Sequence, residues 1–190
     1  MSKKIEQGEE TKRQILETAR LLFGKHGFQN TSTDDILASL NVTRGSLYHH
    51  FKTKKEIFQT LFLEYAHMDS ARVRGKSWKD LNEICSEILD LSQDRAYMFI
   101  VMKDAHSVLS FEESISYDKD FLFKEVSKII KDAIRTKKIR KVHINETVIL
   151  LIGIVNQGLL YLSLVSKKQF PAAKKRYLQT YNLILKSLEI

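Results

Sequence analysis

The segment of residues 31–58, TSTDDILASLNVTRGSLYHHFKTKKEIF, constrains the fold of this chain more than any other part of its sequence. It predicts two short helices joined by a tight turn, because Thr33 and Thr43 are residues of the kind that cap the start of a helix. In the second helix, Leu47 and Phe51 lie one turn apart and can both face a core. The segment therefore predicts a pair of short, closely packed helices.

The outward face of the second short helix has an unusual composition. Gly45, Tyr48, His49 and Lys52 point away from the core side, and Arg44 stands at the start of the helix. Such a face is poor for packing against another helix and well suited to contact with a polyanion. DNA binding is therefore the leading hypothesis for this segment.

Neighbouring residues indicate where the adjoining helices begin and end. Gly27 is a candidate for the left-handed residue that ends the first helix. Asn41 can adopt the same conformation in the turn between the two short helices. Thr53 and Glu56 fit a capping box, so a fourth helix is expected to begin near Lys54.

The rest of the chain continues with helical periodicity, and no run alternates apolar and polar residues as a half-buried strand would. Further helices are expected over residues 10–26, 78–91, 95–109, 120–137, 145–165 and 172–188. The fold class is therefore all-α, with about nine helices. We expect an N-terminal three-helix domain containing the helix-turn-helix over residues 1–53 and a helical body over residues 54–190.

The charge of the chain supports nucleic-acid binding only through its local placement. The formal net charge is +8, but residues 119–190 alone contribute +10, from 15 Lys and Arg against 5 Asp and Glu. Most of the positive excess thus lies outside the helix-turn-helix segment, and a basic pI by itself says little about a partner. More informative is the run from Arg44 to Lys55, which holds four basic residues and no acidic residue.

Other features indicate a soluble, cytoplasmic protein. The single cysteine, Cys85, cannot form an internal disulfide, fits a reducing compartment and is expected to be a small buried apolar residue. The N-terminal residues lack the apolar core of a signal peptide. Residues 148–165 are apolar, but Asn156 and Gln157 interrupt them, which favours a buried helix over a membrane span.

Two other classes of function are alternatives to DNA binding. An enzyme has little support, because the sequence contains no Gly-rich phosphate loop and no HExxH, GxSxG or CxxC motif, so no catalytic residue is expected. No metal site is expected either, since His49 and His50 project about 100° apart on a helix. The second alternative is a helical adaptor that binds a protein or an anionic membrane through its basic C-terminal half, for which loss of the basic residues 137–141 would be the test.

Residues 11–58 resemble the TetR family of bacterial transcriptional repressors. The matching residues are His26-Gly27-Phe28, Thr31-Ser32-Thr33, Ile36, Leu40, Val42-Thr43, Gly45, Leu47-Tyr48, His50-Phe51-Lys52 and Lys54-Lys55-Glu56. One departure is Asn41, where the family usually has Gly. The resemblance implies a DNA-binding regulator that binds a palindromic operator as a homodimer and is released by a small-molecule effector, with no other cofactor.

The chemistry of the major groove assigns roles to the candidate DNA contacts. Arg44 is the expected base reader, because its guanidinium can bind O6 and N7 of guanine, and Gly45 lets the backbone approach. Tyr48 and His49 are expected to contact a phosphate or a thymine methyl group. The expected phosphate contacts are Thr33, Thr43, Ser46, His50, Lys52 and Lys54. His50 fits a packed, hydrogen-bonded histidine equally well.

The resemblance further implies that the helical body binds the effector and joins two chains. The last two helices carry more apolar surface than two surface helices need, so a pair from each chain would form a four-helix bundle. The expected interface residues are Leu151, Val155, Leu159, Leu162, Tyr177, Tyr181 and Leu185. The candidate effector-pocket residues are Phe62, Tyr65, Met98, Phe99, Met102, His106 and Asn156. An ordinary core within one chain is the alternative for both sets.

The effector is expected to act through the fourth helix. By favouring a body conformation that tilts this helix, it would change the spacing of the two DNA-reading helices, so that they no longer match the operator. A coupling free energy of about 1–3 kcal/mol would suffice for such a response.

Overall fold

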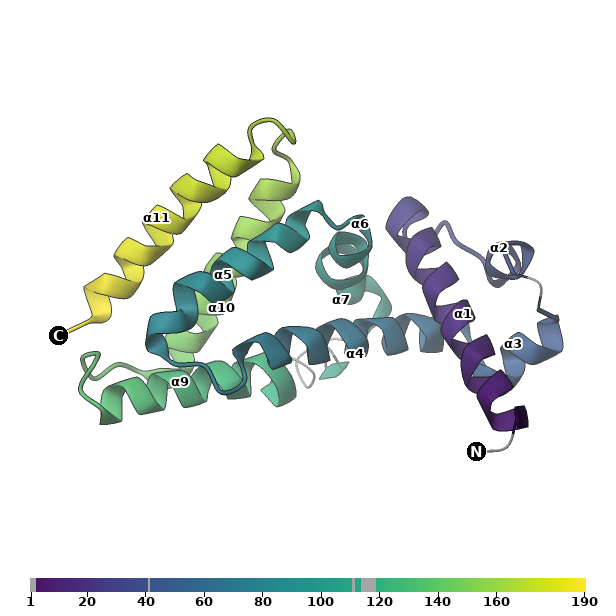
Figure 1. The fold of residues 1–190 in the computed structure, drawn as a ribbon, viewed down its shortest axis with the longest axis horizontal. Helices are drawn as coiled ribbons and strands as arrows, with labels where there is room; N and C mark the ends of the chain where they lie inside the picture. Colours follow the sequence, from purple (N-terminus) through teal and green to yellow (C-terminus); the bar gives the residue numbers. More distant parts are fainter. Residues whose placement is uncertain (1–2, 41, 111, 114–118) are drawn as a thin grey trace. The chain divides into compact units, whose positions relative to one another are not determined.

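The computed structural model describes residues 3–40, 42–110, 112–113 and 119–190. The helices in these ranges are α1 (Lys3–His26), α2 (Thr33–Ala38), α3 (Arg44–His50), α4 (Lys54–Val73), α5 (Leu81–Asp90), α6 (Arg95–Tyr97), α7 (Ala105–Val108), α9 (Lys124–Arg135), α10 (Ile144–Ser163) and α11 (Phe170–Leu188) (Figure 1). Short 3-10 turns η1 (Trp78–Asp80) and η2 (Leu91–Gln93) flank α5, and π-helical segments η3 (Met98–Asp104) and η4 (Lys119–Phe123) precede α7 and α9.

The prediction of an all-α fold is confirmed. The described residues contain no β-strand, and their one isolated antiparallel bridge joins Ile139 to Glu189. The five helical stretches predicted after residue 77 agree with the structure to within two residues at each end. The predicted left-handed turn residue Asn41 lies outside the described residues.

The chain divides into two compact units. The first unit comprises residues 1–65 and 95–111, and the second comprises residues 66–94 and 112–190. Helix α4 contributes to both units. The boundary expected between residues 53 and 54 lies inside the first unit, which continues to residue 65. This unit also includes α6 and η3, which pack against α1.

Helix α1 organises the first unit. Its buried stripe includes Ile15, Ala19 and Phe23, all with no exposed surface, as the apolar periodicity predicts. The helix begins earlier than residue 10 and ends at His26, where Gly27 adopts a φ of +80° and donates its N–H to the carbonyl of Phe23 at 2.8 Å. The predicted C-terminal stop of α1 is therefore confirmed.

Helix α1 approaches α6 unusually closely at Gly24. A Cβ atom at Gly24 would lie 2.8 Å from the Cα of Ala96 and 2.9 Å from its backbone nitrogen. Glycine at residue 24 is therefore what allows the backbones of α1 and α6 to come into contact.

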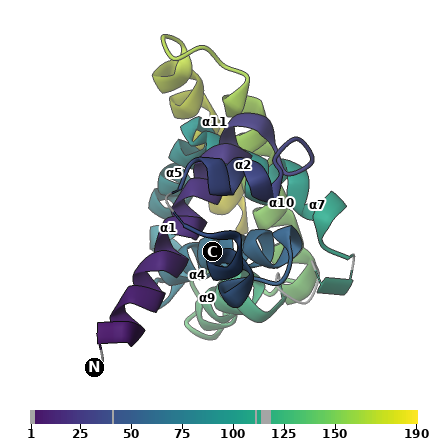
Figure 2. The same cartoon turned by 90° about the vertical axis from the view of Figure 1, so that its right-hand side faces the viewer.

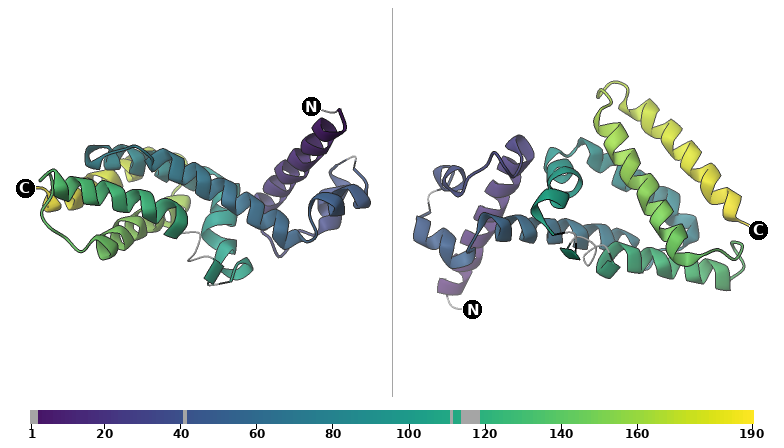
Figure 3. Two further views of the ribbon diagram at one scale, coloured as in Figure 1. Left: turned by 90° about the horizontal axis from the view of Figure 1, so that it is seen from below. Right: turned by 180° about the vertical axis from the view of Figure 1, so that it is seen from behind.

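The second unit is built around α5, α10 and α11, with α9 beside them (Figure 3). Leu89, Val148, Leu159 and Leu162 have no exposed surface and form its core. Cys85 is also buried, as predicted, and this burial raises the pKa of its thiol to about 12. A thiol with so high a pKa is almost entirely protonated at neutral pH, which agrees with a packing role.

Helix α10 is buried on one side only. By its length and composition alone, α10 could cross a membrane. Within the chain, 28 % of its most apolar stretch is buried, and the rest is at least partly exposed. The expectation of a buried helix is therefore correct for one face of α10 and wrong for the other. The exposed face of α10 carries large apolar side chains, among them Ile149 and Leu150.

Replacement of Gly24 by Ala tests the contact between α1 and α6. We expect Gly24→Ala to lower the free energy of unfolding by about 1–3 kcal/mol, because the added methyl group meets backbone atoms that can yield only if the helices separate. The matched control is Gly8→Ala on the same helix, where the nearest atom would lie at an ordinary 3.8 Å. Denaturant unfolding followed by circular dichroism measures both, and equal stability of the two variants would contradict the close approach.

Candidate nucleic-acid interface

The start of α2 is fixed by a capping box one residue before the predicted cap. The Ser32 hydroxyl accepts the N–H of Asp35 at 3.0 Å, and the Asp35 carboxylate accepts the N–H of Ser32 at 2.7 Å. The Ser32 hydroxyl also donates to the Asp35 carboxylate at 2.7 Å, and this bond, followed by the one from the Ser32 N–H, lowers the pKa of Asp35. Ser32 has the extended backbone of an N-cap, whereas Thr33 is the first helical residue. The assignment of the cap to Thr33 is corrected: its hydroxyl does not hold the end of the helix.

The start of α3 is capped as predicted. The Thr43 hydroxyl accepts the N–H of Ser46 at 3.1 Å. Leu47 is fully buried and Phe51 is 2 % exposed, so both anchor α3 to the first unit. The α2 and α3 end of this unit faces the viewer in Figure 2.

The outward face of α3 carries the side chains expected there. The exposed residues are Arg44, Gly45, Tyr48, His49 and Lys52, and Ser46 is half-buried. A Cβ atom at Gly45 would meet only the Thr43 hydroxyl, at 3.9 Å, so this part of the backbone is open to close approach. The structure thus brings the predicted base-reading residues onto one accessible face.

Arg44 forms an ion pair with Asp34, which links α3 to α2. The guanidinium Nη2 and the carboxylate Oδ1 are 2.5 Å apart, and each side chain is 66 % exposed. Ion pairs this exposed contribute little net stability, because water competes for both partners. The guanidinium can therefore exchange the carboxylate for an acceptor on DNA at low cost.

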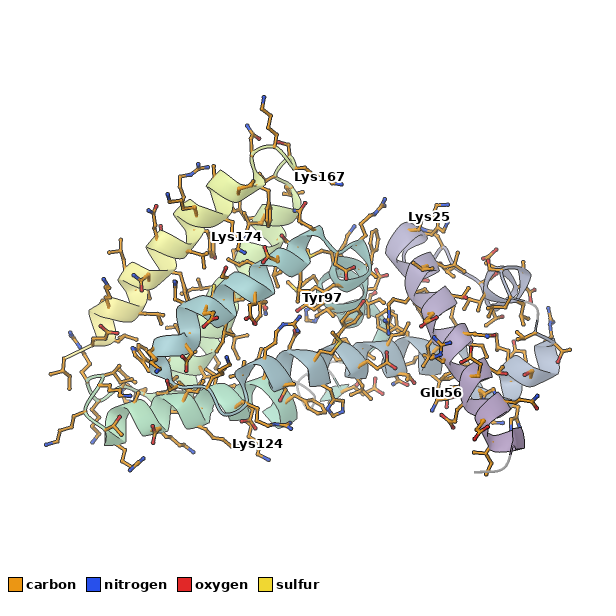
Figure 4. The ribbon with its side chains drawn as sticks, viewed as in Figure 1. Lys25, Glu56, Tyr97, Lys124, Lys167 and Lys174 are labelled. Carbon is orange, nitrogen blue, oxygen red and sulfur yellow. The ribbon has the colours of Figure 1, made fainter. Side chains whose placement is uncertain are left out.

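The junction of α3 and α4 differs in one bond from the predicted capping box. The Thr53 hydroxyl accepts the N–H of Glu56 at 3.1 Å, as expected, but the Glu56 carboxylate accepts the N–H of Lys52 at 2.6 Å (Figure 4). The Lys52 ammonium donates to the carbonyl of Tyr48 at 3.2 Å. The reciprocal bond therefore reaches one residue further back and ties the end of α3 to the start of α4.

His50 is packed beside α1 as well as lying on α3. Its ring makes an edge contact with His49 at 5.2 Å between centroids, and its Cε1 would lie 3.8 Å from a Cβ at Gly8. Burial is the main cause that lowers the pKa of His50, with the charge of His49 adding to it. These contacts favour the packed interpretation, and a phosphate contact by His50 stays a prediction.

The side chain of Lys54 bonds to the loop between α1 and α2. Its ammonium donates to the carbonyls of Phe28 and Thr31, both at 2.7 Å, and lies 4.1 Å from the centroid of the Phe28 ring. Burial lowers its pKa. Two of the three N–H donors of the ammonium are therefore engaged by the loop between α1 and α2, and a phosphate contact by Lys54 stays a prediction.

Six of the seven predicted effector residues lie in the first unit. Phe62, Tyr65 and Met98 are buried, Phe99 and Met102 are half-buried, and His106 is exposed. Tyr65 contacts Tyr97 edge to face at 5.3 Å (Figure 4). Asn156 lies in the second unit and is exposed, so water can satisfy its amide, and an effector contact by Asn156 stays a prediction.

The second unit contains a separate hollow between α5 and α11, with a volume of about 540 Å³. The ammonium of Lys174 on its wall pairs with the carboxylate of Asp90 at 2.6 Å (Figure 4). The Oδ1 atom of Asn82, also on the wall, is buried and has no hydrogen-bond partner among the described residues. None of the predicted effector residues lines this hollow.

Most of the predicted dimer residues belong to the core of a single chain. The buried ones are Leu151, Leu159, Leu162, Tyr181 and Leu185, none more than 4 % exposed. Val155 and Tyr177 are half-buried, and the Tyr177 hydroxyl donates to the carbonyl of Ile154 at 2.6 Å. The assignment of the five buried side chains to a contact between chains is therefore corrected.

A second apolar face of α10 was missed. Its exposed residues are Ile149, Leu150, Leu160 and Tyr161, and Leu164 directly after the helix and Leu183 of α11 are exposed as well. We call these six residues the outer apolar stripe. The spacing of the four on α10 is helical, but α10 has two apolar faces, and periodicity alone does not say which one the chain covers with its own residues.

Removal of the Lys54 amine tests its role in holding the loop before α2. Lys54→Met is expected to lower the free energy of unfolding by about 1–3 kcal/mol, because two carbonyls lose a charged donor. Thermal or denaturant unfolding measures the change. Lys25→Met, an exposed lysine of the same unit, is the control. A stability equal to that of the control would show that the two bonds contribute nothing.

Comparison with known proteins covers both parts of the chain. The family model for "Bacterial regulatory proteins, tetR family" matches residues 15–61, which include α2 and α3. The model for "Tetracyclin repressor-like, C-terminal domain" matches residues 78–188, more than half of the chain.

Individual relatives agree with these matches. The Transposon Tn10 TetC protein of Escherichia coli is 23 % identical over 186 residues, which cover 94 % of this chain and 92 % of that protein. The IcaR negative transcriptional regulator of the biofilm operon icaADBC in Staphylococcus aureus is 42 % identical over 48 residues, 25 % of this chain and 26 % of its own length. Among solved structures, a TetR-family regulator from Pectobacterium atrosepticum superposes with a TM-score of 0.75 at 22 % identity, covering 100 % of this chain and 98 % of its own.

Proposed function

Because the chain belongs to the tetR family of bacterial regulatory proteins, we propose that it is a repressor that binds a palindromic operator as a dimer and leaves it when a small molecule binds. Membership of the family makes the chain a ligand-responsive, DNA-binding regulator of transcription and not an enzyme. We propose repression, as opposed to activation, by analogy with relatives such as IcaR, which is named a negative regulator. The dimer, the operator and the residues that contact DNA are the finer parts of the proposal.

The single observation that carries the proposal is the outward face of α3. Arg44, Gly45 and Tyr48 are exposed together, on a helix that Leu47 and Phe51 hold firmly from behind. The major groove admits one α-helix, and the residues near its N-terminus reach the base edges. Arg44 at that end would read a guanine, Gly45 would allow the backbone to approach, and Tyr48 would contact a phosphate or a thymine methyl group.

Phosphate contacts would fix α3 in the groove. The ammonium of Lys52 and the hydroxyls of Thr43 and Ser46 lie around the same helix. These groups would position the helix on the duplex without reading its sequence.

The outer apolar stripe supports a dimer. Leu150 is 66 % exposed, Leu164 is 88 % exposed and Leu183 is 67 % exposed, on the side of these helices that the chain itself leaves uncovered. An apolar face of this length is costly in water and is relieved when a second copy covers it. A Cβ atom at Gly153 would meet no atom of the described residues within 4 Å, so this glycine would let the partner helix come close. Two copies would present two α3 helices to half-sites about 34–36 Å apart.

The effector would bind in the helical body and act on α4. The first turn of α4 contains Glu56, whose carboxylate accepts the N–H of Lys52 just after α3, and α4 continues into the second unit. A movement of α4 would therefore displace the end of α3. The buried or half-buried Met98, Phe99 and Met102 remain the proposed effector contacts in the first unit, because methionine and aromatic side chains adapt to apolar ligands.

The proposal is tested first by selecting bound sequences from random DNA. Wild-type protein is expected to enrich a palindrome and to bind it with an affinity that falls steeply as salt rises. Arg44→Ala should then cost about 1–3 kcal/mol and relax the preference at one base pair per half-site. Tyr48→Ala should weaken binding while leaving the folded state intact. Mobility-shift titrations measure both.

Arg13→Ala, an exposed arginine of α1 that pairs with Glu10 and Glu17, is the matched control for these titrations. It removes the same charge as Arg44→Ala from a different face. Unchanged operator affinity in both Arg44→Ala and Tyr48→Ala would contradict the assignment of α3 as the reading helix.

The dimer is tested by placing a charge on the outer apolar stripe. Leu150→Lys is expected to convert the dimer to a monomer at micromolar concentration, because a lysine ammonium buried between two chains would lack a partner. Sedimentation velocity measures the mass. Leu21→Lys, at an apolar residue of α1 that is 73 % exposed, makes the same substitution away from the stripe and should leave the dimer intact. Dissociation of both variants, or of neither, would count against this interface.

A further inference from the structure

The loop of residues 27–31, which connects α1 to α2, is held by a carboxylate from a distant part of the chain. The Oδ2 atom of Asp104 accepts the backbone N–H of Phe28 at 2.7 Å, across 76 residues of sequence. Asp104 is the last residue of the π-helical segment η3. The backbone at the entrance to the helix-turn-helix is therefore bonded directly to the end of η3.

The opposite side of the same loop is held just as firmly. The ammonium of Lys54 bonds the carbonyls of Phe28 and Thr31, and the Thr31 hydroxyl donates to the carbonyl of Gly27 at 2.9 Å. The next residue, Ser32, caps α2. The bonds to the carbonyls of Gly27, Phe28 and Thr31 and to the N–H of Phe28 fix the loop, which determines where α2 begins. Both α2 and α3 pack against α1, so a displaced loop would disturb the placement of α3 as well.

The segment that supplies Asp104 lies tightly against the end of α1. A Cβ at Gly27 would be 3.3 Å from the ring of Phe99 and 3.5 Å from the Asp104 carboxylate. Backbone atoms of Ala96 approach Gly24 in the same way. Because the ring of Phe99 and the carboxylate of Asp104 lie against Gly27, we expect a change in η3 to reach the loop.

The π-helical form of η3 gives this segment a second possible arrangement. Seven residues, Met98–Asp104, have π-helical hydrogen bonding, which is rare and occurs often at functional sites. Rewinding of the segment to an α-helix would rotate its last residue away from its present direction. Asp104 would then withdraw from Phe28, whose N–H would be left without this acceptor.

We propose that Asp104 is a positioning residue for DNA recognition, which transmits the state of η3 to α2 and α3 through the N–H of Phe28. The inference rests on the proposed function and deepens it. A molecule that contacts Met98, Phe99 or Met102 changes η3, breaks the bond to Phe28 and releases the loop. This route to the DNA-reading helix runs through η3 and the loop after α1, which Lys54 at the start of α4 also holds.

Because Asp104 is negatively charged, its removal has opposite expected effects on DNA affinity if it positions the loop and if it acts only through its charge. A carboxylate near a DNA-binding surface repels phosphates, so its removal should by electrostatics alone strengthen binding to any duplex. A positioning role predicts the opposite for the operator, because α3 loses its fixed orientation. It predicts no loss for a non-operator duplex, which is bound through phosphates alone.

The experiment measures the dissociation constants of an operator duplex, selected by the wild-type protein, and of a scrambled duplex of equal length. Asp104→Ala is expected to weaken operator binding roughly 10-fold, within the usual range of coupling between sites, and to leave the scrambled duplex bound equally or more tightly. Asp104→Asn keeps an acceptor oxygen and should fall between wild type and Asp104→Ala. Glu17→Gln, which removes an exposed carboxylate from α1, should leave the ratio of the two constants unchanged.

Hydrogen exchange of the Phe28 amide, followed by NMR, reports the bond itself. This amide should be protected in the wild-type protein and exchange faster in Asp104→Ala, in parallel with the loss of operator preference. A merely structural role would lower the unfolding temperature without changing the ratio of operator to scrambled affinity in the folded protein.

The proposal is overturned if Asp104→Ala retains the wild-type ratio of affinities. If Asp104→Ala does not fold, Asp104→Asn decides: faster exchange at Phe28 with an unchanged ratio overturns the proposal, and a reduced ratio supports it. A wild-type protein that prefers no sequence would instead refute the proposed function. The failure of the inference and the failure of the function are thus distinguishable.

Discussion

Three phenylalanine rings hold the entrance and the exit of the helix-turn-helix together. Phe23 on α1, Phe28 in the following loop and Phe58 on α4 lie with ring centroids 5.2–5.9 Å apart. Aromatic side chains bury large areas at tilted and edge-to-face geometries, so the cluster fixes the loop relative to both helices. The segment of α2 and α3 leaves the cluster at Phe28 and returns to it at Phe58. The placement of the reading helix α3 therefore depends on this small apolar core more than on its own few hydrogen bonds.

The sequence predicts those parts of the structure that local chemistry determines. Gly27 ends α1, Thr43 caps α3, and Leu47 and Phe51 are buried, because each depends on residues within one or two turns of helix. The choice of Ser32 over Thr33 as the cap of α2 was missed because both side chains can accept an N–H, and only the backbone direction separates them.

Long-range features were beyond prediction for a different reason. Nothing near Asp104 in the sequence indicates that its carboxylate meets an amide 76 residues away. Lys54 is a basic residue at the start of a helix, which in the sequence indicates a phosphate ligand. Only the folded structure shows that its amine is bonded to two carbonyls of a distant loop. The outer apolar stripe was missed because α10 is apolar on two faces, so the covered face follows from how α5 and α11 pack on it.

The ion pair between Arg44 and Asp34 has a consequence for how such a protein would find its site in a genome. A regulator spends most of its search on incorrect sequences, bound loosely through phosphates. While it slides, Asp34 competes with every passing phosphate for the guanidinium of Arg44, and a guanine in the correct place adds its O6 and N7 acceptors to that competition. We expect this competition to shorten the time spent on each incorrect sequence, so that a weak, exposed ion pair would increase the speed of the search while adding little to stability.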